Sequence, residues 1–191
     1  MTLLQVMAES DAADVRLRTV DRGLIGTELA KRGILFDRWP TKAGLDIRRP
    51  PQQILAQYSD RVDELNSDGR YKYVDVAALQ PDDRDPGWHD TASAARSKFL
   101  AEHRHAEDEV RFFAAGRGCF YLHLGPEVLA VVCEGGDLLS VPAGVRHWFD
   151  MGARPDFVAI RFFQEEDGWI GHFTGDAIGE RFPTLDQLVA A

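Results

Sequence analysis

His103, His105, Glu109 and Arg111 occupy odd-numbered positions in the stretch HRHAEDEVRFFAAG, which covers residues 103–116. In a β-strand, successive side chains point to opposite faces, so residues of one parity share a side. If residues 103–113 form one strand, then His103, His105, Glu109 and Arg111 lie along a single face. The stretch therefore predicts three candidate metal ligands and a cation on one side of a strand.

A second stretch, GDLLSVPAGVRHWF, covers residues 136–149 and supplies a further histidine. It predicts a strand over residues 138–141, a turn marked by proline and glycine, and a new strand with His147 and Phe149 on one face. Three imidazoles and one carboxylate are a suitable ligand set for a divalent transition metal. We therefore predict that His147 joins His103, His105 and Glu109 in binding one metal ion.

Together the two stretches resemble the paired motifs of the cupin superfamily. The first motif reads His-x-His, three residues, Glu, six residues, Gly, and the second reads Gly, five residues, Pro-x-Gly, two residues, His. All of those positions are met, but Ser97 replaces the Gly that usually opens the first motif, and Met151 replaces the Asn that usually ends the second. Short apolar segments with regular turn signals over residues 103–163 also favour an antiparallel double-sheet barrel. The predicted fold is mainly β with α additions: a cupin double-stranded β-helix, or jelly-roll barrel, with an N-terminal α/β extension.

Blocks outside these motifs resemble the acireductone dioxygenase family. They are FDRWP at 36–40, KFLAEH at 98–103, EDEVRFF at 107–113, SVP at 140–142, HWFDMG at 147–152, and GWI at 168–170 through FTGD at 173–176. The resemblance implies a metal-dependent dioxygenase (an oxidoreductase) of the methionine salvage pathway, which serves methionine biosynthesis. It also implies a monomer that uses one Fe²⁺ or Ni²⁺ ion per chain.

The implied reactants are O₂ and a small-molecule acireductone, 1,2-dihydroxy-5-methylthiopent-1-en-3-one. With iron, the family forms 4-methylthio-2-oxobutanoate and formate; with nickel, it forms 3-methylthiopropanoate, formate and CO. Four protein ligands leave about two positions free on an octahedral ion, which suits a chelating enediolate. Imidazole-rich sites accept several divalent metals, so the ligand set does not choose between iron and nickel.

The resemblance implies roles for three further residues. Arg111 would help to generate the substrate dianion; the alternative is a structural cation, but its parity places it beside Glu109. Glu102 would act in metal incorporation, and Asp108 would relay local conformational change. Both have even numbers, so parity predicts that they point away from the metal, towards solvent or towards hydrogen bonds that support the ligands.

Two aromatic residues, Phe149 and Trp169, are candidates for lining a pocket for the methylthio group, with ordinary core packing as the alternative. The remaining histidines are not predicted to bind the metal. His89 lies in a polar loop and His172 in a terminal glycine-rich stretch, and His123 has no partner at ligand spacing.

Composition and charge exclude several classes of protein. The chain has 191 residues, of which 45% are hydrophobic, and a formal net charge of −9, which disfavours binding to nucleic acid or to anionic membranes. No apolar run approaches the roughly 20 residues that span a bilayer, and the N-terminal stretch lacks the basic, apolar pattern of a signal peptide. Cys119 and Cys133 make no disulfide framework and are expected to be buried thiols. We predict a cytoplasmic protein.

The length predicts one domain over residues 1–191, with N-terminal strands and helices at 1–95, a metal-binding barrel core at 96–165, and a C-terminal loop and helix at 166–191. Strands are expected at 3–7, 15–20, 34–39, 71–79, 120–124, 128–133, 138–141, 147–149 and 157–163. Helices are expected at 26–31, 51–66, 92–100 and 185–189, and a loop at 80–88.

Two other functions use the same ligands. One is a different cupin metalloenzyme, such as another dioxygenase or a sugar isomerase. The other is a cupin that binds a small molecule to regulate transcription. A regulator would normally carry a basic helix-turn-helix segment, which the N-terminal part does not show.

Overall fold

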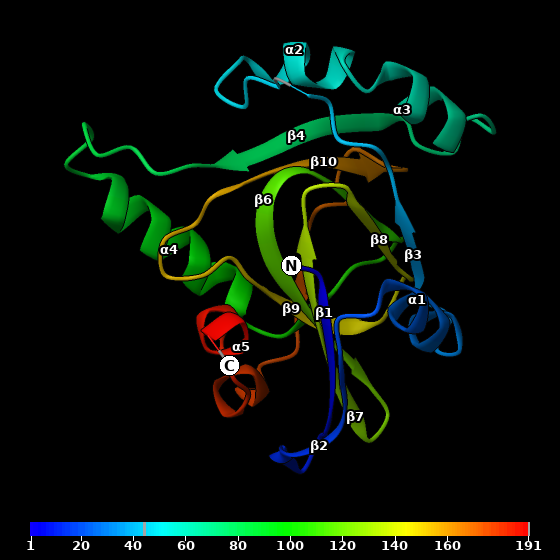
Figure 1. Cartoon of the computed structure of the whole chain (residues 1–191), viewed down its shortest axis with the longest axis vertical. Coiled ribbons are helices and arrows are strands. Elements are labelled where there is room, and N and C mark those ends of the chain that lie inside the picture. The colour runs from blue at the N-terminus through cyan, green and yellow to red at the C-terminus, as the bar shows by residue number, and fades with distance from the viewer. Residues whose placement is uncertain (44, 191) are drawn as a thin grey trace.

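Strand β6 (Glu109–Leu124) is the longest strand of the computed structural model, which describes residues 1–43 and 45–190, and it belongs to two sheets. Its first residues pair with β8 and β10, whereas residues from Arg117 onward pair with β7 and β9. The strand curves between the two sheets, as Figure 1 shows. Every strand pairing is antiparallel.

The first sheet has the order β11-β5-β9-β6-β7-β1-β2. Its other strands are β1 (Leu3–Ala8), β2 (Asp11–Thr19), β5 (His103–Arg104), β7 (Glu127–Glu134), β9 (Arg146–Asp150) and β11 (His172–Phe173). In the second sheet β10 and β8 flank β6, and β4 and β3 lie outside them. These strands are β3 (Leu35–Arg38), β4 (Tyr73–Leu79), β8 (Asp137–Val141) and β10 (Phe157–Phe163).

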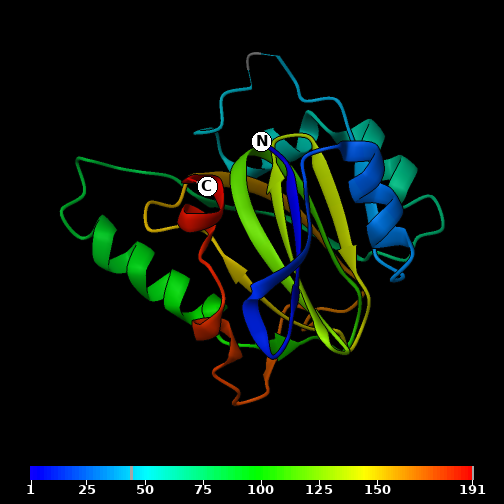
Figure 2. The same cartoon turned by 60° about the horizontal axis from the view of Figure 1, so that its bottom comes forward.

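The helices lie around the sheets, with α1 and α4 on opposite sides in both views (Figures 1 and 2). They are α1 (Arg22–Ala30), α2 (Pro51–Ala56), α3 (Ser59–Leu65), α4 (Trp88–Leu100), the 3-10 helix η1 (Ile178–Arg181) and α5 (Leu185–Ala190). Asp21 caps α1, because its side chain accepts a hydrogen bond from the Leu24 amide at 2.8 Å.

Three apolar clusters bury both faces of the strands. One cluster fills the space between the sheets, where Phe120, Leu129 and Phe149 of the first sheet meet Phe113 and Val141 of the second. The outer face of the first sheet packs against η1 and α5, and that of the second sheet packs against α2 and its neighbours. Because both faces are buried, the strands are continuous apolar runs, which is why composition located them in the sequence.

The predicted fold class is confirmed: the chain is mostly antiparallel β-structure of the cupin type. Among the residues that the structure describes, the end strands β2 and β11 do not pair with each other, so the sheet does not close into a complete barrel. The N-terminal strands also extend the first sheet, since β1 pairs with β7 and β2 pairs with β1.

Two sequence-based expectations about elements are wrong. Residues 103–113 are not one strand, because β5 ends at Arg104 and β6 begins at Glu109. The helix expected at 51–66 is two helices, because Tyr58 has non-helical backbone angles (φ −113°, ψ 11°) and buries its ring against Phe112. The helix expected at 92–100 begins earlier, at Trp88, and the C-terminal stretch contains β11 and η1 in addition to the expected helix.

Asp150, at the end of β9, ties the strand that carries His147 to its surroundings. Its buried carboxylate accepts hydrogen bonds from the Arg96 guanidinium of α4 at 2.7 and 3.1 Å, and from the Leu185 amide of α5 at 2.8 Å. Charge-assisted bonds of this kind hold elements firmly. They fix β9, and with it His147, against both helices.

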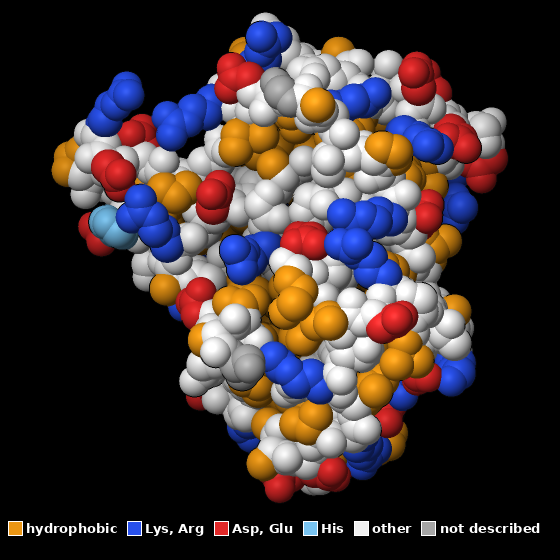
Figure 3. All heavy atoms as spheres, viewed as in Figure 1, with side chains coloured by type: hydrophobic (Ala, Val, Ile, Leu, Met, Phe, Trp, Pro, Cys, Tyr) orange, Lys and Arg blue, Asp and Glu red, His pale blue; other side chains and the backbone are white. Residues whose placement is uncertain are grey.

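Acidic and basic side chains are interspersed with hydrophobic ones on the face shown in Figure 3. No helix in the described ranges 1–43 and 45–190 has the length and apolar character needed to cross a bilayer. The cysteines are free and buried, as expected.

Candidate metal centre and active site

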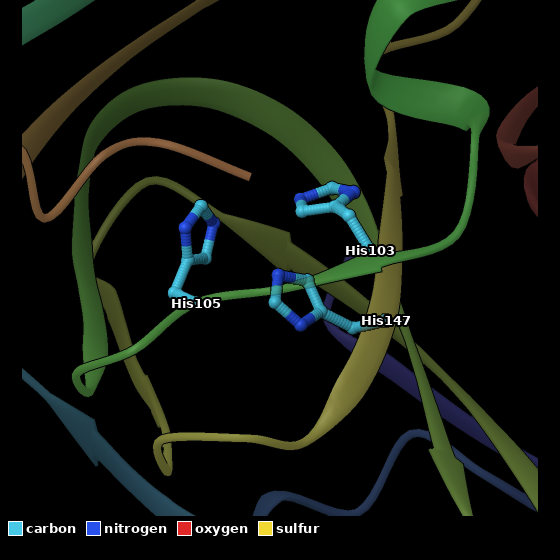
Figure 4. A group of neighbouring side chains, drawn as sticks. All are labelled: His103, His105 and His147. Atoms are coloured by element: carbon cyan, nitrogen blue, oxygen red, sulfur yellow. The ribbon is translucent and has the colours of Figure 1, made fainter. Parts of the chain in front are cut away.

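Three histidine rings point toward one another inside the fold (Figure 4). His103 of β5 and His147 of β9 are opposite each other in the sheet register, and His105 follows β5. The ring centroids are 4.5 Å apart for His103 and His147, 5.1 Å for His103 and His105, and 5.3 Å for His105 and His147. One ring nitrogen from each residue lies within 4.8 Å of the others, so the three imidazoles surround one point.

Backbone carbonyls orient all three rings. The Nδ1–H groups of His103, His105 and His147 donate to Ala101 O at 2.8 Å, Ile170 O at 2.9 Å and Val145 O at 2.8 Å respectively. Because a carbonyl can only accept, each ring must carry its hydrogen on Nδ1. In the neutral ring with this tautomer, Nε2 presents a free lone pair, which is the arrangement that a metal-binding histidine needs.

Burial favours the neutral form of two of these imidazoles, those of His103 and His105. Desolvation, with the neighbouring His147 ring, lowers the pKa of His103 to about 4, and desolvation also lowers the pKa of His105. Metal ions bind the neutral ring, so both residues are ready to act as ligands at neutral pH.

Glu109, at the start of β6, places a carboxylate beside two of these rings, those of His105 and His147. Its Oε2 lies 2.7 Å from Nε2 of His147 and 3.5 Å from Nε2 of His105, while Oε1 pairs with the Arg111 guanidinium. Burial works to raise the pKa of Glu109, but the charge of the adjacent Arg111 lowers it well below its usual value.

The atoms Glu109 Oε2 and His147 Nε2 show how well these residues suit a metal. Both are buried without a hydrogen-bond partner. With the hydrogen of His147 on Nδ1, they are two electron-pair donors 2.7 Å apart, an arrangement that needs a cation between or beside them. The donor set of three imidazole nitrogens and one carboxylate oxygen fits a divalent transition metal.

Arg111 is a fixed, buried cation beside this centre. It follows Glu109 on the same face of β6, and its guanidinium lies over the rings of Phe120 and Phe149, 5.2 and 5.1 Å from their centroids. Burial lowers the pKa of Arg111, opposed by the charge of Glu109. The side chain also lines a cavity that opens beside the histidines.

That cavity has a volume of about 270 Å³ and combines cations with apolar rings. Besides His103, His105, Glu109 and Arg111, it is lined by Lys98, Phe99, Arg161, Phe163, Trp169, Ile170, Gly171 and Phe173. An anionic organic molecule with an apolar tail fits such a lining, because the cations would hold its charge and the rings would cover its tail.

Arg161 was not predicted from the sequence. It lies opposite Arg111 in the register of β10 and β6, and its guanidinium donates to both carboxylate oxygens of Asp75, at 2.8 and 2.6 Å. A single arginine inside the apolar run FVAIRFF at 157–163 is the signal that could have identified it. Lys98, which lies 5.8 Å from the centroid of the Trp169 ring, gave no such signal.

The expectation that the predicted ligands before Arg111 share one strand face is wrong, although the ligands themselves lie close together. The chain leaves the sheet between Arg104 and Glu109, so His105 and Glu109 do not share a strand face. Two carboxylates hold this connection in place. Glu107 accepts a hydrogen bond from the Gln164 amide at 2.7 Å, and Asp108 accepts one from the Ala143 amide at 2.9 Å. Parity holds only for Glu109 and Arg111, within β6.

Glu102 and Asp108 make contacts away from the histidine cluster. The buried Glu102 accepts hydrogen bonds from His123 Nδ1 at 2.6 Å and from the Thr174 hydroxyl at 2.7 Å. Asp108 joins the loop of the first motif to the turn of the second through Ala143. Glu102 therefore contacts β6, which carries Glu109, and Asp108 contacts the turn that precedes His147.

The two aromatic candidates, Trp169 and Phe149, lie in different surroundings. Trp169 lines the cavity with 53% of its surface exposed, whereas Phe149 is absent from the lining and packs in the core beneath Arg111. Of the other histidines, His123 bonds to Glu102, His89 meets the Trp88 ring edge-on in α4, and His172 lies in β11.

Comparison with known proteins identifies the family. The profile of the ARD/ARD' family matches residues 5–171. Acireductone dioxygenase 2 and acireductone dioxygenase 1 of Nocardia farcinica are 66% and 57% identical to this chain over 194 and 189 residues, covering 100% and 99% of this chain and all of theirs.

A solved structure agrees with the sequence relatives. The acireductone dioxygenase from Bacillus anthracis with a cadmium ion in its active centre superposes with a TM-score of 0.71 at 25% identity, covering 91% of this chain and 99% of that one. The family profile and the relatives each span most or all of the chain, and the fold matches as well. The chain therefore belongs to the ARD/ARD' family.

Proposed function

We propose that this protein is a metal-dependent acireductone dioxygenase of methionine salvage, acting on 1,2-dihydroxy-5-methylthiopent-1-en-3-one and O₂. The observation that carries the proposal is the convergence of three imidazoles, oriented by backbone carbonyls, and the Glu109 carboxylate beside a cation-lined cavity. Full-length similarity to proteins named acireductone dioxygenase supports the choice of substrate.

His103, His105, Glu109 and His147 would hold one Fe²⁺ or Ni²⁺ ion per chain. Such an ion would supply Lewis-acid chemistry, lowering the pKa of an enediol oxygen so that the substrate binds as an anion. In the iron form the proposed products are 4-methylthio-2-oxobutanoate and formate, and in the nickel form 3-methylthiopropanoate, formate and CO.

The arginines would act on the charge of the substrate. The Arg111 guanidinium is already protonated at neutral pH, so it cannot act as a base. It would instead stabilise negative charge, which favours the substrate dianion. Its position over Phe120 and Phe149 keeps it in place before the substrate arrives. Arg161, on the neighbouring strand, adds a second positive group to the same cavity.

The apolar rings would accommodate the methylthio end. Phe163, Trp169 and Phe173 line the cavity together with Ile170, and a thioether packs well against aromatic rings. We further propose a monomeric, cytoplasmic protein with one domain that binds neither nucleic acid nor membranes; the net charge of −9 supports the last two points.

Reconstitution with single metals tests the proposal. The metal-free protein, loaded separately with Fe²⁺ and Ni²⁺ and given acireductone with O₂, should consume the substrate in both forms, and only the nickel form should release CO. Substrate loss is followed by absorbance and products by chromatography. A protein that binds one ion but converts no acireductone in either form would be a different cupin metalloenzyme or a small-molecule-binding cupin.

Replacing Trp169 by alanine should raise KM about tenfold, roughly 1.4 kcal/mol, with a smaller effect on kcat, because the ring contacts the apolar end of the substrate and not the reacting atoms. Steady-state kinetics measure both constants. Leu35→Ala is the control, because Leu35 is equally exposed at 53% but lies on β3, outside the cavity lining. Equal KM values in the two variants would show that Trp169 does not contact the substrate.

A further inference from the structure

The three histidines differ in where their orienting carbonyls come from. His103 and His147 each donate to the carbonyl two residues earlier in the chain, Ala101 and Val145. His105 instead donates to Ile170, which is 65 residues away along the chain. The orientation of His105 therefore depends on a distant segment, whereas the other two rings are held by carbonyls just before their own strands.

That segment, residues 164–171, which we call the strap, connects β10 to β11 and crosses the metal centre. It touches a second histidine as well, since a Cβ on Gly171 would lie 3.1 Å from Cδ2 of His103. The strap also carries Trp169 and Ile170, which line the cavity. The orange-brown ribbon that approaches His105 in Figure 4 belongs to this part of the chain.

Glu107 fastens the strap to the loop between the first two histidines and Glu109. Its Oε2 accepts hydrogen bonds from the Gln164 amide at 2.7 Å and the Glu165 amide at 3.2 Å. Its Oε1 is buried without a partner and fills the space beside Gly168, where an added Cβ would lie only 1.2 Å away. The backbone at residue 168 can approach this closely only because it has no side chain.

We propose that Glu107 is a positioning residue for the metal ligand His105, acting through the strap and the carbonyl of Ile170. The inference rests on the metal site of the proposed function. Through the strap, Glu107 sets the direction of the Nε2 lone pair of His105, and the strap residues Trp169 and Ile170 link the cavity wall to the same hydrogen bond. Loss of a group that orients a ligand typically weakens metal binding about 10- to 100-fold.

The test compares the three histidines within one molecule. ¹⁵N-labelled protein loaded with Zn²⁺, which is diamagnetic, gives a separate Nδ1–H resonance for each ring. In Glu107→Ala, the His105 resonance should shift or exchange rapidly with water, while those of His103 and His147 keep their positions. The rate of Zn²⁺ release to a chelator should rise about 10- to 100-fold.

Matched variants separate positioning from general damage. Glu165→Gln changes an exposed carboxylate on the strap itself and should leave all three resonances unchanged. Glu107→Gln keeps an acceptor oxygen for the two amides and should restore most of the wild-type behaviour. If Glu107→Ala does not fold, Gly168→Ala displaces the strap from the opposite side; its control is Gly26→Ala, where an added Cβ meets nothing within 4 Å.

The two hypotheses fail in different ways. If the wild-type protein binds no metal, the proposed function is wrong. If the wild-type protein binds Zn²⁺ but Glu107→Ala and Gly168→Ala leave the His105 resonance and the release rate unchanged, the positioning role of Glu107 is wrong and the metal site stands. Equal shifts of all three histidines would also overturn it, because they would indicate a general loosening of the site.

Discussion

Replacing His147 by alanine should abolish metal retention and lower turnover at least about a thousandfold, since a metal supplies several kcal/mol of transition-state stabilisation and each 1.36 kcal/mol is tenfold in rate. His147 faces His103 across the sheet and approaches Glu109 Oε2 at 2.7 Å, so its loss opens one side of the ligand set. Metal content by elemental analysis and kcat with added Fe²⁺ measure the two effects.

A histidine outside the centre provides the control for this variant. His89 lies on α4, where its ring meets that of Trp88 edge-on, and His89→Ala should keep both the metal and the activity. Thermal unfolding of the two metal-free variants shows whether the fold survives. Full metal occupancy in His147→Ala would contradict the proposed ligand set.

Replacing Arg111 by alanine should lower kcat about a hundred- to a thousandfold, the loss typical when one preorganised group that stabilises developing charge is removed. The metal should stay bound, because none of the four ligands changes and the ion itself then compensates the charge of Glu109. The metal-free variant should lose roughly 3–5 kcal/mol of stability, because Glu109 becomes a buried charge without its partner.

Arg117→Ala is the matched control for Arg111, because this arginine lies on the same strand but is exposed. Its kcat and metal content should equal those of the wild type. If Arg111→Ala loses the metal instead of turnover, then Arg111 holds Glu109 in place for the ion and does not act on the substrate.

The sequence was most informative where local chemistry determines structure. The Pro142 and Gly144 turn between β8 and β9 follows from residues adjacent in the chain, and the strands expected at 128–133 and 157–163 are β7 and β10 because apolar runs mark strands buried on both faces. The breaks at residues 105–108 and at Tyr58 were missed, because their causes are contacts with distant segments: amides after β10 and the core around Phe112.

In the candidate site, too, the residues marked by local sequence were predicted, and those that depend on distant segments were not. Motif spacing identified the three histidines, which the structure brings around one point, and Glu109, which lies beside His105 and His147. Arg161, Lys98 and the carbonyl of Ile170 lie beside them only through the pairing of β10 with β6 and the course of the strap. Phe149 illustrates the converse: strand parity puts it on the face of His147, but Arg111 lies over its ring, and the cavity ends before it.

The sharing of β6 by two sheets has a consequence for how the protein acquires its ion. Glu109 enters through one sheet and His147 through the other, and His105 obtains its orienting carbonyl only from Ile170, near the end of the chain. The proposed metal centre is therefore complete only when both sheets and the strap are in place, so metal binding is expected to depend on the whole fold and not on one local motif.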